Sequence, residues 1–225
     1  WRKLGTENIL MSKFSFATSP EGFDNHITNS IRGYDVLNEN IVSISKYFVE
    51  PQTNVFDLGC STGNLINKIQ EENPEAEYYG IELCEDFAKI PNDNIAYLEE
   101  DIRDTWIDDA SFVTSVFTLQ FINPEDRLEI LSNIYHGLNV GGGFVVAEKI
   151  LATDSKMQDI FTSTYYDFKS EKFTAKEIFD KERELRSMLK PMPLEDLTNM
   201  LYDVGFKSVQ PFWQSYLFVG ILAIK

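Results

Sequence analysis

The sequence predicts an α/β fold: a mostly parallel seven-stranded sheet that ends in an antiparallel hairpin and carries a helical cap. Three observations support this fold class. An apolar segment at 55–58 runs through a glycine turn into an amphipathic helix at 64–72. Strand segments then alternate with helices as far as residue 148, which is typical of parallel sheets with right-handed crossovers. Two final strand segments, 208–213 and 216–224, predict the hairpin.

The chain before the first strand divides into three parts. Residues 1–10 are treated as a candidate leader, so that 11–225 is expected to be one domain. Residues 14–32 form an irregular, aromatic segment, which we expect to cover the site instead of joining the sheet. A helix is predicted at 34–48 and is expected to end before Pro51. Its apolar residues recur every three or four positions, at Leu37, Ile41, Ile44 and Phe48.

The middle of the chain supplies the remaining parallel strands. A near-continuous apolar run at 112–117 indicates a strand buried on both faces. A helix is predicted at 124–138, with Pro124 in its first turn and Gly137 near its end. The other predicted strands lie at 78–81, 94–98 and 144–148.

A long polar helical segment, 155–186, interrupts the alternation. Its apolar face is formed by Ile160, Phe161, Tyr165, Tyr166 and Phe168. We expect the whole insertion, 155–190, to cap the site or to form a dimer contact. A further helix is predicted at 193–204, where Gly205 ends it.

Composition limits the classes of function. The formal net charge is −16 and the pI is about 4.5, which argues against direct nucleic-acid binding, because such binding depends on neutralised phosphates. No apolar run is long enough to span a bilayer, and no signal peptide is recognised. The only cysteines are Cys60 and Cys84, so no disulfide framework is expected and a reducing cytoplasm suits the chain.

The segment 57–64, D-L-G-C-S-T-G-N, has the features of a nucleotide site. Gly59 and Gly63 allow positive φ and a close approach of the backbone to a ligand. The following helix leaves backbone N–H groups free at its N-terminus. A phosphate loop is excluded because no Gly-Lys-Ser/Thr follows. The pattern resembles the D/E-x-G-x-G-x-G turn of class I S-adenosylmethionine (SAM) methyltransferases, with Ser61 at the middle glycine; the alternative is an ordinary strand–turn–helix corner.

An acid stands where the next predicted strand ends. Glu82 lies 25 positions after Asp57, about where a carboxylate meets the ribose hydroxyls in nucleotide-binding βαβ units. The alternative is a solvated carboxylate at a strand end. Spacing and local context favour the ribose role.

Several short segments carry a more specific resemblance. They are G-Y-D at 33–35, V-F-D-L-G-C-S at 55–61, D-I-R-D at 101–104, F-T-L-Q-F at 117–121, I-Y-H-G-L-N-V-G-G at 134–142, E-K at 148–149, D-F-K at 167–169, E-I at 177–178 and the C-terminal G-F-K…F-V-G-I-L-A-I-K. Together they resemble the carboxy-S-adenosyl-L-methionine (carboxy-SAM) synthase, or CmoA-like, family of class I methyltransferases. The resemblance covers about 14–225 and implies a Rossmann-like fold with SAM, or alternatively carboxy-SAM, as the cofactor.

The resemblance also implies which residues contact the amino-acid end of the cofactor. Tyr34 is one of them, and backbone groups of the glycine turn supply the others, at Gly59, Cys60 and Ser61. Asp57 and Phe117 lie in matching motifs and belong to the same predicted cofactor-binding set.

The ribose and adenine contacts implied by the resemblance come from two strand ends. Glu82 holds the ribose and Leu83 lies beside the adenine. Asp101 and Ile102 bracket the adenine, and the carboxylate of Asp101 accepts its amino group. No metal site is predicted.

Two positions depart from the family pattern. Val116 stands where members carry an asparagine before F-T-L-Q-F. An ungapped alignment from 177–178 places Glu182 where members carry the arginine that pairs with the carboxylate of carboxy-SAM, and a carboxylate there repels that ligand. Arg183 or Arg186, the latter one helical turn further on, is a candidate substitute. The alternative is that these residues form a solvated helix face.

Three functions are weighed. The first is methyl transfer from SAM to an unidentified small-molecule acceptor. The second, implied by the resemblance and opposed by the altered arginine position, is carboxy-SAM synthesis from SAM and prephenate for tRNA wobble-uridine modification. The third is SAM binding by a non-catalytic partner subunit. A homodimer in the cytoplasm is expected.

A general base is optional for methyl transfer, depending on the acceptor. The candidate catalytic residues near the opening are His26, Tyr34, Tyr165 and Tyr166. For the tyrosines the alternative is core packing with a hydrogen-bonded hydroxyl, and for the histidine it is fixing the cap. His136 is expected to be structural, near a helix C-terminus.

Overall fold

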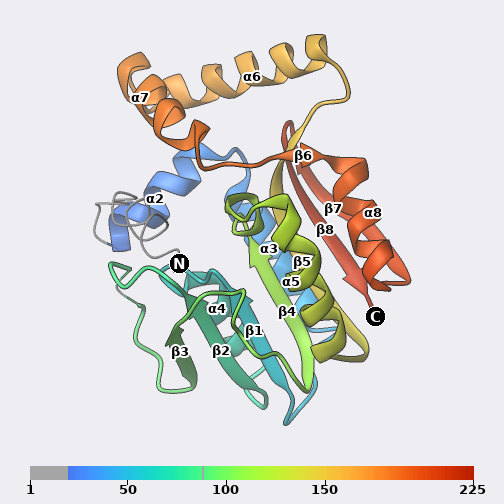
Figure 1. Ribbon diagram of the computed structural model, residues 1–225. Coiled ribbons are helices and arrows are strands. Elements are labelled where there is room, and N and C mark those ends of the chain that lie inside the picture. Colours follow the sequence, from blue (N-terminus) through green and yellow to red (C-terminus); the bar gives the residue numbers. More distant parts are fainter. Residues whose placement is uncertain (1–19, 88) are drawn as a thin grey trace, which may run out of the picture.

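A seven-stranded sheet runs through the part of the chain described by the computed structural model, residues 20–87 and 89–225 (Figure 1). The strand order is β3-β2-β1-β4-β5-β8-β7; β8 is antiparallel to both of its neighbours, and the other pairs are parallel. A short β6 pairs with the end of β5, off this path. The predicted sheet and hairpin are confirmed. The strands are β1 (Asn54–Leu58), β2 (Glu77–Glu82), β3 (Ile95–Glu99), β4 (Ala110–Val116), β5 (Leu138–Leu151), β6 (Met192–Pro193), β7 (Ser208–Ser215) and β8 (Phe218–Ile224).

The strand order reverses at β1. This strand lies between β2, where Leu58 pairs with Ile81, and β4, where Asp57 pairs with Thr114. Connections on the two sides of such a point run over opposite faces of the sheet. Open α/β sheets bind ligands at the carboxyl ends of the strands at such a point. We call the region at the carboxyl ends of β1 and β4 the crevice.

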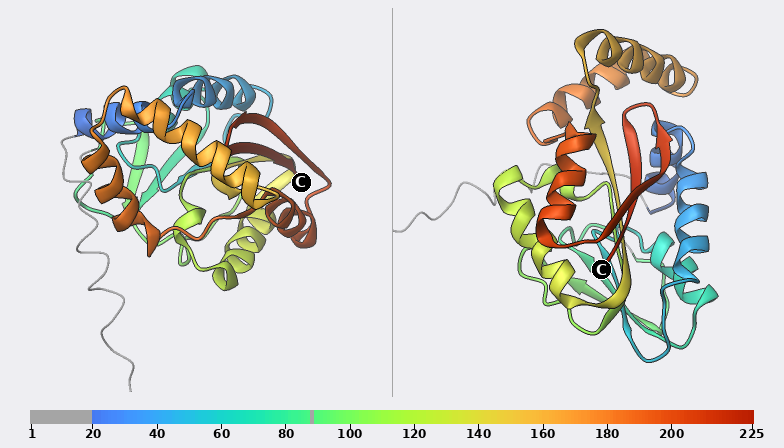
Figure 2. Two further views of the ribbon diagram at one scale, coloured as in Figure 1. Left: turned by 90° about the horizontal axis from the view of Figure 1, so that it is seen from above. Right: turned by 90° about the vertical axis from the view of Figure 1, so that its right-hand side faces the viewer.

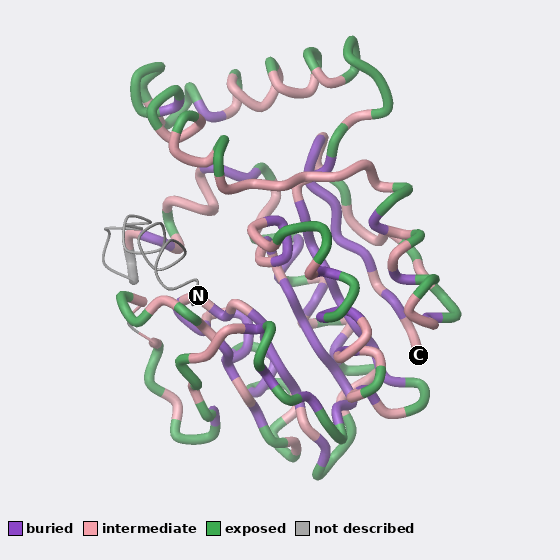
Figure 3. Tube along the Cα trace, in the orientation of Figure 1, coloured by how far each residue is buried: buried purple, intermediate pink, exposed green. Residues whose placement is uncertain are grey.

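Helices cover both faces of the sheet (Figure 2). Consecutive strand residues point to opposite faces. Phe112 accordingly packs in one apolar cluster and Val113 in the other. Both central strands, β1 and β4, are buried along nearly their whole length, as Figure 3 shows, because helices lie on each side. One layer is α3 (Tyr34–Ser45) with α4 (Asn64–Glu72), and the other is α5 (Pro124–Gly137) with α8 (Leu194–Val204).

Several element boundaries differ from the predicted ones, including the end of α3 and the starts of β5 and β8. α3 ends at Ser45, and a separate turn carries the chain on towards Pro51. β5 begins at Leu138 instead of at 144, directly after α5 ends at Gly137; the ring of Phe48 occupies the space that a side chain at Gly143 would need. β8 begins at Phe218 because the preceding residues form the hairpin turn.

The prediction of an irregular segment before Gly33 is wrong for residues 20–30, which form the helix α2 (Pro20–Ser30). Its inner face carries Phe23 and Ile27, and Ile31 continues the same four-residue spacing just beyond the helix. Asparagine and aspartate between them are poor helix formers, and burial of this face outweighs their preference. Residues 14–19 of the segment lie outside the described residues.

The predicted helical insertion forms two helices, α6 (Ser155–Ser170) and α7 (Ala175–Arg186). Thr174 and Glu177 exchange hydrogen bonds in a capping box, which starts α7 as a separate helix. Together with α2, these helices lie beyond the carboxyl ends of the strands (Figures 1 and 2). We call α2, α6 and α7 the cap. None of the described helices is long and apolar enough to cross a membrane.

Candidate functional site

The glycine turn after β1 forms the floor of the crevice. Gly59 and Gly63 both have a φ of +82°, and Ser61 has a φ of +53°. A Cβ at Gly59 would collide with the side chain of Thr118, which follows β4. Glycine is therefore required at position 59 both for its backbone conformation and for the close approach of the two loops.

Glu82, the last residue of β2, is hydrogen-bonded to the glycine turn. One carboxylate oxygen accepts the N–H of Ser61 at 3.0 Å, and the other accepts the N–H of Cys84 at 3.0 Å. The N–H groups of Gly59 and Cys60 both donate to the carbonyl of Ile81. The acid predicted to hold a ribose thus lies directly against the glycine turn, with lone pairs left for further donors.

Asp57 lies deeper, within the sheet. Its carboxylate accepts the hydroxyl of Thr114 at 2.7 Å, and the residue is 3% exposed. Burial raises the pKa of Asp57 to about 7; the Thr114 hydrogen bond lowers it, and the charge of Glu82 raises it. This hydrogen bond joins β1 to β4 just before the glycine turn begins.

Asp101 lies after β3 and already has a cationic partner. Its carboxylate accepts the N–H and the guanidinium of Arg103, with Nη2 to Oδ2 at 2.7 Å. Burial raises the pKa of Asp101, but the bonds to Arg103 outweigh it and leave the pKa below its ordinary value. Ile102 beside it is buried, whereas Leu83 is exposed. Sequence reasoning missed Arg103, although the D-x-R spacing was a signal.

An aromatic row leads from the crevice to the cap. The ring centroid of Phe117 is 6.2 Å from that of Tyr34 and 5.8 Å from that of Phe218. Phe218 in turn is 5.5 Å from Tyr165 of α6. We call these four residues the aromatic row. It brings two of the predicted catalytic tyrosines, Tyr34 and Tyr165, to its opposite ends.

The titration of the catalytic candidates does not favour the tyrosines as bases. Burial raises the pKa of Tyr34 to about 12 and also raises the pKa values of Tyr165 and Tyr166. His26 lies on α2 with its ring 5.2 Å from Phe173. Burial and then the charge of Lys169 lower the pKa of His26, so that its imidazole is neutral at pH 7.

Two lysines that sequence reasoning missed meet at the end of the aromatic row. The Nζ of Lys149 is 5.4 Å from the centroid of Tyr165, and the Nζ of Lys169 is 5.3 Å from it. Both belong to quoted motifs, E-K and D-F-K, but neither motif indicated that the two would converge.

The predicted substitutes for the family arginine lie on the outer part of α7. Arg183 and Arg186 are exposed. Glu182 is half-buried, and its charge acts on Tyr165, Tyr166 and Lys169.

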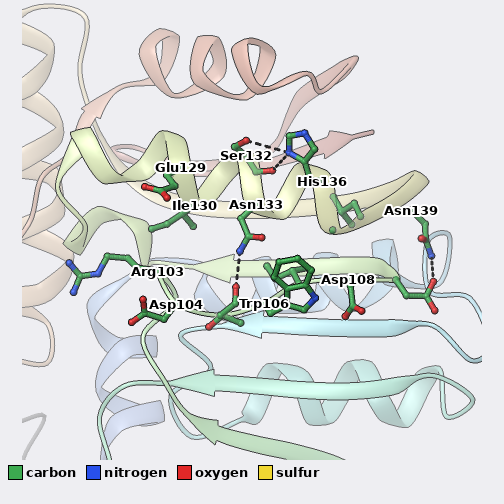
Figure 4. Close-up of a pocket in the computed structure, with 15 residues that line it drawn as sticks. Arg103, Asp104, Trp106, Asp108, Glu129, Ile130, Ser132, Asn133, His136 and Asn139 are labelled. Carbon is green, nitrogen blue, oxygen red and sulfur yellow. Dashed lines mark hydrogen bonds between the residues drawn. The ribbon is translucent and has the colours of Figure 1, made fainter.

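A groove of about 700 Å³ lies elsewhere, between α5 and the segment 103–109 (Figure 4). None of the predicted site residues lines it. Asn133 closes one side by donating to the carbonyl of Thr105 at 2.7 Å. His136 donates from Nδ1 to the carbonyl of Ser132 at 2.7 Å, which agrees with a structural role.

Comparison with known proteins gives consistent matches. A family described as a methyltransferase domain matches residues 55–142. A carboxy-S-adenosyl-L-methionine synthase from Staphylococcus epidermidis is 37% identical, with 97% of this chain and 99% of that protein covered. One of the same name from Shewanella halifaxensis is 31% identical, over 96% of this chain and 94% of that protein.

Solved structures show the same fold. Human N-acetylserotonin methyltransferase in complex with SAM superposes with a TM-score of 0.66 at 16% identity, covering 99% of this chain. This chain spans 60% of that protein's length. A putative O-methyltransferase from Nostoc punctiforme superposes with a TM-score of 0.59 at 16% identity, over 84% of this chain and 57% of that one. The fold is therefore the Rossmann-like fold of class I methyltransferases.

Proposed function

Because the chain belongs to the carboxy-S-adenosyl-L-methionine synthase family of SAM-dependent enzymes, we propose that it binds SAM in the crevice and converts it to carboxy-SAM. One structural observation carries the proposal: Glu82 is held against the glycine turn by the N–H of Ser61. A carboxylate in this position supports the proposal because it can accept ribose hydroxyls beside a backbone that can approach a ligand closely.

The residues of the crevice fit an adenosyl ligand. The absent side chain at Gly59 leaves room for the turn to fold back, since a Cβ would collide with Thr118. Backbone groups of Cys60 and Ser61 and the ring of Tyr34 would hold the amino-acid end. The carboxylate of Glu82 would accept hydrogen bonds from the ribose hydroxyls.

The adenine would lie between Leu83 and Ile102, with Asp101 accepting its amino group. Arg103 already fixes the orientation of Asp101. Asp57 and Phe117 would support the ligand indirectly, Asp57 from beneath the turn and Phe117 from the wall of the crevice.

When bound, SAM supplies a carbon activated by the neighbouring sulfonium. The protein then has to orient the second substrate and exclude water, which the cap and the aromatic row can do. Tyr34 and Tyr165 keep their protons at neutral pH because burial raises their pKa values, so they act as hydrogen-bond donors. Among the four candidates, His26 is the group able to accept a proton at pH 7.

Methyl transfer to an acceptor is a second candidate, and one observation favours it. Glu182, in place of the family arginine, puts a negative charge near Tyr165 and Tyr166. That charge repels the extra carboxylate of carboxy-SAM.

Mass spectrometry distinguishes the two candidates. The purified protein is incubated with SAM, with and without prephenate, and its bound and released nucleosides are weighed. Carboxy-SAM formed only with prephenate supports the synthase. Plain SAM, or S-adenosylhomocysteine formed with a methyl acceptor and no carboxy-SAM, supports methyl transfer and contradicts the first proposal.

The biological setting is proposed on the same basis. A small molecule is the second substrate, the enzyme works in the cytoplasm, and carboxy-SAM feeds tRNA wobble-uridine modification without direct RNA binding. We propose a homodimer through the exposed apolar side chains of Met157 and Ile160 on α6 and Phe179 on α7. Sedimentation of the parent and of Ile160→Asp tests this, because a monomeric parent contradicts it.

A further inference from the structure

Two ammonium groups, one from β5 and one from α6, contact the aromatic ring of Tyr165. Lys149 lies near the end of β5, and Lys169 lies in the last turn of α6. Both Nζ atoms are within cation–π distance of Tyr165. Lys149 also lies 5.9 Å from the centroid of Phe218, and Lys169 lies 5.6 Å from that of Phe173.

This pair has no acidic partner at ion-pair distance in residues 20–87 and 89–225. Lys169 is only 3% exposed. Burial lowers its pKa, as do the charges of Lys149 and Lys181, and Glu182 only partly offsets them. Burying an ammonium without a counter-ion is unfavourable, so the site would gain from an anion.

The absence of an acidic partner at ion-pair distance from Lys149 and Lys169, within the part of the chain that the structure describes, contrasts with the composition of the whole chain. The chain has 36 acidic residues against 20 lysines and arginines. Beneath the cap, the charges of Lys169 and Lys181 lower the pKa of His26, and the charge of Glu184, which pairs with Lys181 at 3.0 Å, raises it. Lys149 and Lys169 have no such ion pair among the described residues. A cationic centre in so acidic a protein attracts small anions and concentrates them there.

The side chain of Gln120 links the backbone at Lys149 to the backbone at Phe117. The side chain of Gln120 donates to the carbonyl of Phe117 at 3.1 Å and accepts the N–H of Lys149 at 3.0 Å. Phe218 contacts both Phe117 and Lys149. The lysine pair therefore lies at the Tyr165 end of the aromatic row, which leads back through Phe218 to Phe117.

We propose that Lys149 and Lys169 together bind a carboxylate of the second substrate, an organic acid whose apolar part packs on the aromatic row. This inference rests on the proposed function. Two ammonium groups outnumber the single carboxylate of Glu182, so that residue does not exclude an anion.

The test is calorimetric binding of prephenate to the full chain saturated with S-adenosylhomocysteine. Lys149→Met and Lys169→Met remove the charges and keep unbranched side chains. Lys172→Met, at an exposed position just after α6, is the matched control. We expect the Kd of prephenate to rise at least tenfold in each of the first two variants and to stay unchanged in the control. The Kd of S-adenosylhomocysteine is expected to change less than twofold in all three.

Other outcomes decide against the assignment. It is wrong if the parent does not bind prephenate, or if both variants bind it as the parent does. Carboxy-SAM offers the same chemical group, so loss of its affinity with prephenate affinity retained would assign the pair to the product. A parent that does not bind S-adenosylhomocysteine would contradict the proposed function itself.

Thermal unfolding separates a binding role from a structural one. Removing an unpaired buried ammonium is expected to leave the Tm of Lys169→Met unchanged or to raise it. A fall in Tm together with loss of prephenate binding would indicate packing instead. Lys149 is half-buried, so its variant keeps the test decisive if Lys169→Met does not fold.

Discussion

The backbone N–H of Ser61 donates a 3.0 Å hydrogen bond to the carboxylate of Glu82. This bond joins the turn after β1 to the end of β2, two loops that face the same ligand in the proposed function. Because the N–H of Cys84 holds the second oxygen, the carboxylate is oriented by the protein alone. A group oriented in advance loses little further freedom when a ligand binds.

Replacing this carboxylate tests the ribose contact. In Glu82→Gln the amide nitrogen cannot accept a hydrogen bond, so either a backbone N–H or a ribose hydroxyl loses its acceptor. We expect the Kd of SAM, measured by calorimetry, to rise about tenfold to a hundredfold, in line with about 1.5–3 kcal/mol for a hydrogen bond to a charged group. Glu77→Gln, at the exposed other end of β2, is the control and should bind SAM like the parent. Equal affinities in all three proteins would contradict the ribose assignment.

Alanine substitutions at two glycines with nearly the same φ distinguish the energetic cost of backbone strain from the cost of a steric collision. Gly59 has φ +82° and Gly141 has φ +85°, but a Cβ at Gly141 meets no atom within 4 Å. Gly141→Ala should lower the free energy of unfolding by about 1 kcal/mol. Gly59→Ala should lower it by about 3 kcal/mol and abolish SAM binding, because the loop carrying Thr118 must move. Urea unfolding measures both, and equal losses would show that the collision is relieved without cost.

The pH dependence of stability should report on Asp57. Its pKa is raised from 3.8 to about 7 in the folded protein, so its contribution to stability is fully present below pH 3.8 and is lost as the pH rises through 7. Asp57→Asn removes this loss. Its free energy of unfolding relative to the parent should therefore increase between pH 4 and pH 8, by up to about 4 kcal/mol.

The comparison of variants isolates this group. Glu148 is also buried, with a pKa raised to about 8, and it adds a dependence of the same sign to parent and variant alike. Asp93→Asn, at an exposed position, should follow the parent across the pH range. A constant difference between Asp57→Asn and the parent would show that Asp57 does not titrate in this window.

Arg103 is expected to act on the adenine through Asp101. Arg103→Met frees the carboxylate from its guanidinium, so the pKa of Asp101 rises and its orientation is lost. We expect the Kd of SAM to rise about threefold to tenfold. Arg103→Lys should recover part of the loss, since it restores the charge without the two-point geometry. No change in either variant would exclude a positioning role.

Local sequence patterns were sufficient to predict most of the secondary structure of this protein. The period of apolar residues placed most strands and helices to within a few positions, since side-chain spacing follows directly from backbone geometry; β5, which begins at Leu138 instead of 144, is an exception. The glycine turn and the spacing from Asp57 to Glu82 located the crevice, because a βαβ unit brings successive strand ends together. The helix α2 was missed because its support comes from burial and not from the helix preferences of its residues.

Contacts between segments far apart in the sequence were decided only by the tertiary structure. Lys169 lies four residues after Tyr165 on α6, so helix spacing accounts for that contact. The approach of Lys149 to Tyr165 depends on how α6 lies relative to the end of β5, and no spacing in the sequence encodes that arrangement. The bond from Gln120 to Lys149 likewise depends on β4 and β5 being neighbours. The amino-acid sequence by itself determined the fold class and predicted where a nucleotide would bind. Packing decided that the charges of Lys149 and Lys169 meet at Tyr165, because a charge is brought to its place by the elements that carry it.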